Sequence, residues 1–131
     1  MQSMRLGLAV PLAILATACA ATSADGSPEW AKIEIRPDPV YQPLLQGPPQ
    51  TRGMESGRVV IAPGKAGERH STDEYEEQLL FLQGKARVLL GSEVVNVAAG
   101  EILYIPPHTE HEIHNDGPEE LRYVYVVAPV R

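Results

Sequence analysis

Two segments of this chain, residues 64–84 and 100–115, carry polar side chains at positions where a strand would bury them. Glu77 falls in step with large apolar side chains two and four residues further on, so a strand would place its carboxylate on an apolar face. His111 falls in step with an isoleucine in the same way. Burying such groups is costly unless they are paired or bind a metal ion, and the pattern leaves both outcomes open. If the register slipped by one residue, Glu76 would take the place of Glu77.

The elements that must position these side chains are short strands. Apolar runs separated by glycine and proline turn signals fill the chain from residue 57 onward, and none has a helical period over three turns. Short strands at even spacing are typical of a β-sandwich or β-barrel, so we predict one all-β domain. A first short strand is predicted near residues 30–35, within an extended, proline-rich arm over 30–56. The later strands are predicted near 58–62, 75–83, 85–90, 93–97, 101–105, 110–115 and 121–128.

The two polar segments resemble the two sequence motifs of the cupin superfamily. The resemblance extends directly over residues 64–115 and implies a single-domain cupin, which is a double-stranded β-helix or jelly-roll barrel. Thr72 stands where the first motif normally has its second histidine, and His108 stands where the second motif normally has a glycine. The residues that keep the motif spacing are Gly64, His70, Glu77, Gly84, Gly100, Pro106, His111 and Asn115.

The resemblance to cupins also implies a metal site. By that resemblance the ligands are His70, Glu77 and His111, and they would hold one divalent ion: Fe, Mn, Zn or Ni. Two imidazoles and a carboxylate form an open ligand set of the kind that non-haem iron and catalytic zinc use. Thr72 and His108 are candidates for an additional ligand or for support behind the ligands. The alternative is a cupin fold that has lost its metal.

For function, we predict that the protein binds or acts on a small molecule in the mouth of the barrel. Fe or Mn would suit dioxygenase chemistry, and Zn, Ni or Mn would suit isomerase or lyase chemistry. The fold does not choose among these. Phe81, Tyr104 and Tyr123 are predicted to shape the pocket. The alternative is a non-catalytic module of the cell envelope that binds or senses a small molecule.

The N-terminus has the features of an export signal. Residues 1–18 combine one positive charge, a short apolar run and small residues at the end, which is typical of a signal peptide. Cys19 follows in a context that resembles a bacterial lipobox, so we predict lipidation there; ordinary signal-peptidase cleavage is the alternative. Residues 19–29 would be a tether and 57–131 the barrel. The protein is therefore predicted to be exported, periplasmic, and anchored to the outer membrane if Cys19 is lipidated.

Composition and charge narrow the set of partners. The net charge is −6 and no long basic run occurs, so a nucleic-acid partner is not expected. A single cysteine excludes a disulfide within the chain. Contact with the membrane is expected only through the lipid. Leu80 and Leu82 would form an apolar outer face, covered either by the N-terminal arm or by a second subunit, and with the apolar run 123–127 they predict a homodimer.

Overall fold

The structure is a computed structural model, and it describes residues 22–131. This part of the chain folds into nine strands and contains no helix, so no helix that could cross a membrane occurs in it. The predicted all-β fold is confirmed. The strands are β1 (Tyr41–Gln46), β2 (Glu55–Ile61), β3 (His70–Ser71), β4 (Tyr75–Gln83), β5 (Lys85–Leu90), β6 (Glu93–Ala98), β7 (Ile102–Ile105), β8 (Glu110–His114) and β9 (Leu121–Pro129).

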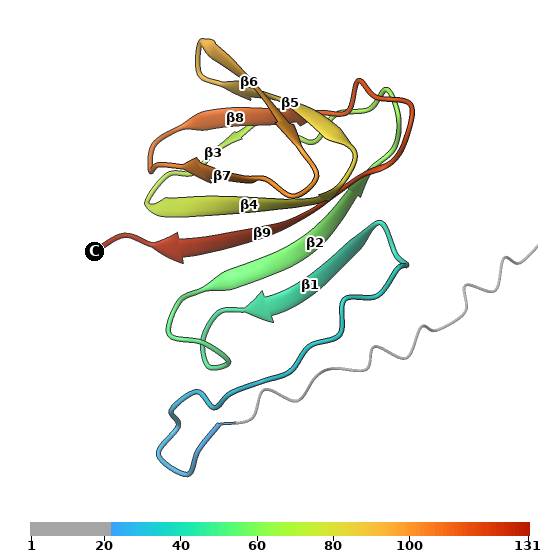
Figure 1. Cartoon of the computed structure of the whole chain (residues 1–131). Helices are drawn as coiled ribbons and strands as arrows, with labels where there is room; N and C mark the ends of the chain where they lie inside the picture. The colour runs from blue at the N-terminus through green and yellow to red at the C-terminus, as the bar shows by residue number, and fades with distance from the viewer. Residues whose placement is uncertain (1–21) are drawn as a thin grey trace, which may run out of the picture.

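The strands form two antiparallel sheets in a jelly-roll arrangement. One sheet has the order β1-β2-β9-β4-β7 and the other has the order β3-β8-β5-β6 (Figure 1). Alternation along each strand directs one set of side chains between the sheets, where they form the core. In β4, for example, Leu79 and Phe81 are 0% and 1% exposed, whereas Leu82 is 46% exposed. Strands that are far apart in the sequence pair with each other, so β8 lies between β3 and β5.

The N-terminal arm differs from the prediction. Residues 30–35 form no strand, and Trp30 is 89% exposed, so the strand predicted there is wrong. A strand lies further along the arm instead: β1 pairs with β2, with a register shift just after Pro43. Proline is tolerated because β1 is the edge strand of its sheet, where a missing N–H breaks no interior ladder. The segment 30–35 has no neighbouring strand to pair with, and the β-propensity of its residues is not enough to form a strand without one.

The arm covers the outer face of β2 rather than that of β4. Arg58 is 1% exposed and donates a hydrogen bond from Nη2 to the carbonyl of Arg36 at 2.9 Å. Gln42 bonds the arm in the same region, donating to the Glu34 carbonyl at 2.9 Å, and Arg122 donates to the carbonyl of Pro37 at 2.8 Å. The apolar outer face of β4 therefore stays open to solvent, which leaves the second-subunit alternative for it.

Two motif residues have structural roles that explain their type. Gly84 has a φ of +81° in the turn between β4 and β5, and a Cβ there would lie 2.7 Å from the carbonyl oxygen of Glu120. Asn115 is buried at the end of β8, where its amide donates to the carbonyls of Ile61 and Glu119, both at 2.9 Å. These residues hold the closed end of the jelly roll and do not belong to the polar site.

The predictions for the extreme N-terminus lie mostly outside the described residues. The signal peptide over 1–18, the lipidation of Cys19 and the first residues of the tether all fall in residues 1–21. The rest of the tether forms a hydrogen-bonded turn, closed by a bridge between Thr22 and Pro28.

Candidate metal centre

Three strands from two sheets bring His70, Glu77 and His111 to one point. His70 on β3 pairs directly with His111 on β8, and their rings meet edge to face with centroids 4.3 Å apart. Glu77 points inward from β4 in the opposite sheet. One ligand atom from each residue lies within 4.8 Å of the others. Ligand atoms about a bound transition metal are roughly 3 to 4 Å apart, so a small closing movement would suffice.

Both imidazoles are oriented by the backbone. His70 Nδ1 lies 3.0 Å from the carbonyl of Glu68, and His111 Nδ1 lies 3.2 Å from the carbonyl of Thr109. A proton on each Nδ1 satisfies these carbonyls and leaves the Nε2 lone pairs free to bind an ion. His111 Nε2 is buried and lies 3.1 Å from Oε2 of Glu77, yet it has no hydrogen-bond partner among the described residues. A buried nitrogen without a partner, facing a carboxylate, fits a metal ligand.

The electrostatics of the pair favour a cation between them. The carboxylate of Glu77 is only 6% exposed and His111 only 1%. Burial lowers the pKa of His111, but the Glu77 carboxylate and the Thr109 carbonyl outweigh it, so the pKa of His111 is raised. A divalent ion would bring the positive charge that the buried carboxylate lacks when both rings are neutral.

Thr72 lies behind His111 and supports it. Its hydroxyl donates to the carbonyl of Pro106 at 2.7 Å and accepts from the N–H of Thr109 at 3.0 Å. The carbonyl of Thr109 then accepts from the Thr72 N–H and from the His111 ring. Of the two roles predicted for Thr72, the hydrogen bonds therefore favour support over ligation. The residue that replaces the usual histidine of the motif fixes the turn that orients His111.

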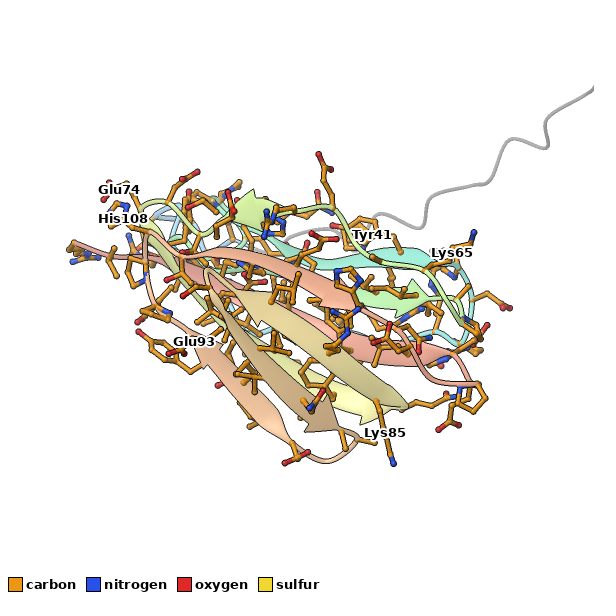
Figure 2. All side chains as sticks on the ribbon, turned by 90° about the horizontal axis from the view of Figure 1, so that it is seen from above. Tyr41, Lys65, Glu74, Lys85, Glu93 and His108 are labelled. Atoms are coloured by element: carbon orange, nitrogen blue, oxygen red, sulfur yellow. The ribbon has the colours of Figure 1, made fainter. Side chains whose placement is uncertain are left out.

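His108 does not join the three ligands. It has a φ of 54° in the turn after β7, and this turns its ring outward, where Nε2 lies 3.5 Å from Oε1 of Glu74. Figure 2 labels both side chains at one end of the molecule. Glu76 is exposed on the outer face of β4 and accepts a hydrogen bond from Tyr104 at 3.1 Å. The register therefore directs Glu77 inward and excludes the alternative that Glu76 is the ligand.

The three predicted pocket aromatics have different positions. Tyr104 is 56% exposed on the outer face, so the structure does not place it in a pocket. Phe81 belongs to the closed core, packed against Tyr123 with ring centroids 5.7 Å apart. Of the three, Tyr123 lines the cavity beside the ligands.

That cavity has a volume of about 480 Å³, within the range of about 300–1,000 Å³ that is typical of small-molecule sites. His70 and Glu77 lie in its wall. Sequence reasoning missed most of the other residues of the wall, among them Glu55, Asp73 and Tyr125. Tyr125 could have been found, because it alternates in step with Tyr123. Glu55 could not, because it falls in the region predicted to be an irregular arm.

Comparison with known proteins agrees with this geometry. The family model described as a cupin domain matches residues 57–127, which is more than half of the chain. The polyketide synthase CurC of Streptomyces cyaneus is 33% identical over 85 residues, which cover 63% of this chain but only 55% of CurC. An uncharacterized protein of Streptomyces coelicolor is 29% identical over 80 residues, covering 60% of this chain and 72% of that protein.

Solved structures show the same fold. A cupin 2 conserved barrel domain protein from Salinispora arenicola superposes with a TM-score of 0.63 at 24% identity, covering 76% of this chain and 92% of that one. A protein with a double-stranded β-helix domain from Klebsiella pneumoniae superposes with a TM-score of 0.62 at 23% identity, covering 83% and 89%. With its jelly-roll topology and a domain match over residues 57–127, the chain belongs to the cupin superfamily.

Proposed function

We propose that this cupin holds one divalent metal ion through His70, Glu77 and His111 and uses it to bind a small molecule in the adjacent cavity. The observation that carries the proposal is the convergence of three ligand atoms within 4.8 Å at the wall of that cavity. A bound metal would supply Lewis acidity, or a redox centre if it is iron or manganese. The relative named as a polyketide synthase supports a small organic molecule as the ligand.

The chain's own residues prepare the site for this role. The backbone carbonyls of Glu68 and Thr109 hold the two rings so that their Nε2 atoms face inward. Three protein ligands leave coordination positions open toward the cavity, which is where a small molecule would bind. Fe or Mn would favour dioxygenase chemistry, and Zn, Ni or Mn would favour isomerase or lyase chemistry.

The test is the metal content of the purified protein, measured by inductively coupled plasma mass spectrometry for wild type, His111→Ala and His108→Ala. We expect one equivalent of metal in wild type and in His108→Ala, because His108 lies outside the ligand set. His111→Ala should lose the metal. Equal metal content in all three proteins would refute the assignment, and a wild-type protein that binds no divalent ion would favour a metal-free binding module.

We also propose that the protein is exported and carries a lipid on Cys19. The support is the sequence of residues 1–19, with its short apolar run and small residues before the cysteine. Expression of wild type and Cys19→Ser in a bacterial host with fractionation tests this. Wild type should fractionate with the outer membrane and Cys19→Ser should not; identical fractionation of the two proteins would refute lipidation.

A homodimer is the last part of the proposal. The outer face of β4 and β7 exposes Leu82 by 46% and Ile102 by 59%. Apolar groups gathered on one open sheet face are typical of an interface between subunits. Light scattering should therefore give twice the mass of the chain.

A further inference from the structure

The sheet face that the N-terminal arm covers carries two arginines side by side. Val124 of β9 lies opposite Arg58 of β2, and Arg122 lies two residues before Val124 on the same face of the sheet. Arg58 is 1% exposed, whereas the side chain of Arg122 is 26% exposed. Like charges on neighbouring strands repel each other, so this pair destabilises the sheet unless negative charge lies between or beside them.

The arm holds both guanidinium groups through two successive carbonyls. Arg58 donates from Nη2 to the carbonyl of Arg36 at 2.9 Å, and Arg122 donates from Nη1 to the carbonyl of Pro37 at 2.8 Å. Because the two acceptors are neighbours in the chain, the two guanidinium groups meet beneath the arm. A carbonyl has no net charge, so these contacts orient the arginines without neutralising them.

Arg58 has further N–H groups that no protein group accepts. Its Nε and Nη1 are buried, as is Nε of Arg122, and none of the three has a hydrogen-bond partner among the described residues. Arg122 is paired with Glu120 at 3.0 Å, whereas Arg58 forms no ion pair within residues 22–131. The sequence of residues 1–21 contains no aspartate or glutamate that could pair with it.

The positive charge of Arg58 therefore lacks a direct counter-charge. Burial and the neighbouring charge of Arg122 lower the pKa of Arg58, but a guanidinium does not lose its proton in a protein. The carboxylates of Asp38 and Glu120 oppose the shift, yet both residues are exposed and solvent weakens their effect. Water could accept from the free N–H groups but would leave the charge unbalanced, whereas a small anion would do both.

We propose that Arg58 and Arg122 bind one monovalent inorganic anion of the size of chloride, and that this anion fastens the arm to β2 and β9. Burial sets the size, because the anion must fit under the arm without breaking the hydrogen bonds that hold it. The partly exposed side of Arg122 provides the way in. Val59, the next residue of β2, lines the cavity on the opposite face, so the anion site is separate from the metal ligands.

Crystals of the full chain grown in sodium bromide locate the site directly, because bromide replaces chloride and scatters anomalously. We expect an anomalous difference peak in contact with the guanidinium group of Arg58. A water molecule at Arg58, or bromide peaks only at other places, would overturn the proposal.

Thermal melts then test the site in solution. Wild type, Arg58→Met and Arg87→Met are compared in sodium chloride and in sodium gluconate at equal ionic strength, since gluconate is too large to fit under the arm. Chloride at about ten times its Kd should raise the Tm of wild type by roughly 5 °C over gluconate. Arg58→Met keeps an apolar stem without the charge and should melt at one temperature in both salts. Arg87 is paired with Asp116 on the other sheet, so its variant should keep the wild-type shift.

Each remaining outcome decides against the site. A bromide peak without any chloride effect on the wild-type Tm would mean an adventitious ion only, and a full chloride shift in Arg58→Met would mean that the ion acts elsewhere. If Arg58→Met does not fold, the bromide crystals and the wild-type melts still decide the question, because neither uses a variant.

Discussion

Replacing Glu77 by glutamine should raise or preserve the stability of the metal-free protein and weaken that of the metal-loaded protein. Glu77 is buried, and His111, whose Nε2 lies 3.1 Å from Oε2 of Glu77, balances its charge only when the ring is protonated. At a pH above the raised pKa of His111 this ring is neutral, so a neutral amide of similar shape removes a buried charge that no neighbouring positive charge balances. We expect an unfolding free energy between unchanged and about 2 kcal/mol higher, which corresponds to a rise in Tm of at most roughly 10 °C.

In the metal-loaded protein the same substitution should lower stability, because glutamine replaces the single anionic ligand. Losing it should raise the Kd by at least about 100-fold, more than the usual loss of a supporting hydrogen bond. At free metal of about 100 times the wild-type Kd, binding stabilises wild type by about 2.7 kcal/mol and the variant by only about 0.4 kcal/mol. Thermal melts followed by dye fluorescence, with chelator and with metal, measure both quantities on one plate.

Glu76→Gln is the matched control. Glu76 neighbours Glu77 but lies on the outer face, where its carboxylate accepts a hydrogen bond from Tyr104. The unfolding free energy of this variant should stay within about 0.5 kcal/mol of the wild-type value, both with and without metal. A Glu77→Gln protein that is less stable without metal, yet keeps the full shift with metal, would refute the reasoning, since Glu77 would then be a structural residue.

Three further predictions test other parts of the structure. Thr72→Val should weaken metal binding by about tenfold, as measured by competition with a chelator, and Thr72→Ser should restore it, because the hydroxyl fixes the turn behind His111. Gly84→Ala should lower the unfolding free energy by about 3 kcal/mol, measured in urea, whereas Gly91→Ala, with positive φ but open space around it, should cost only about 1 kcal/mol. Leu82→Lys should convert the proposed dimer to a monomer in light scattering, while the same change at the exposed Val94 of the other sheet should not.

The structure shows clearly which parts of the fold were predictable. Strand alternation and turn residues placed β4 to β9 to within one residue, whereas β2 begins three residues before the predicted strand and β3 was not predicted. These features are local: the side-chain period of a strand and the turn residues at its ends depend on neighbours in sequence. For the same reason Glu77 could be assigned to the inner face before any contact was known.

The arm was the least predictable element. A strand at the sheet edge gains its stability from pairing with β2, and the sequence of β1 contains a proline that argues against a strand. Consequently Glu55, at the start of β2, was not recognised as a residue of the inner face. The prediction that Tyr104 lines the pocket was wrong for a related reason, because the sequence did not show which face of β7 points inward.

The sequence by itself determined an all-β domain and the inward direction of Glu77 and His111, because both follow from the local period of the strands. Its resemblance to the cupin motifs implied the cupin fold and the three candidate ligands. Only the tertiary structure decided that Thr72 supports His111, that His108 turns outward and that Glu55 contributes to the wall of the cavity. Those outcomes depend on which backbone groups of distant segments meet, and a single sequence does not specify the distances between them.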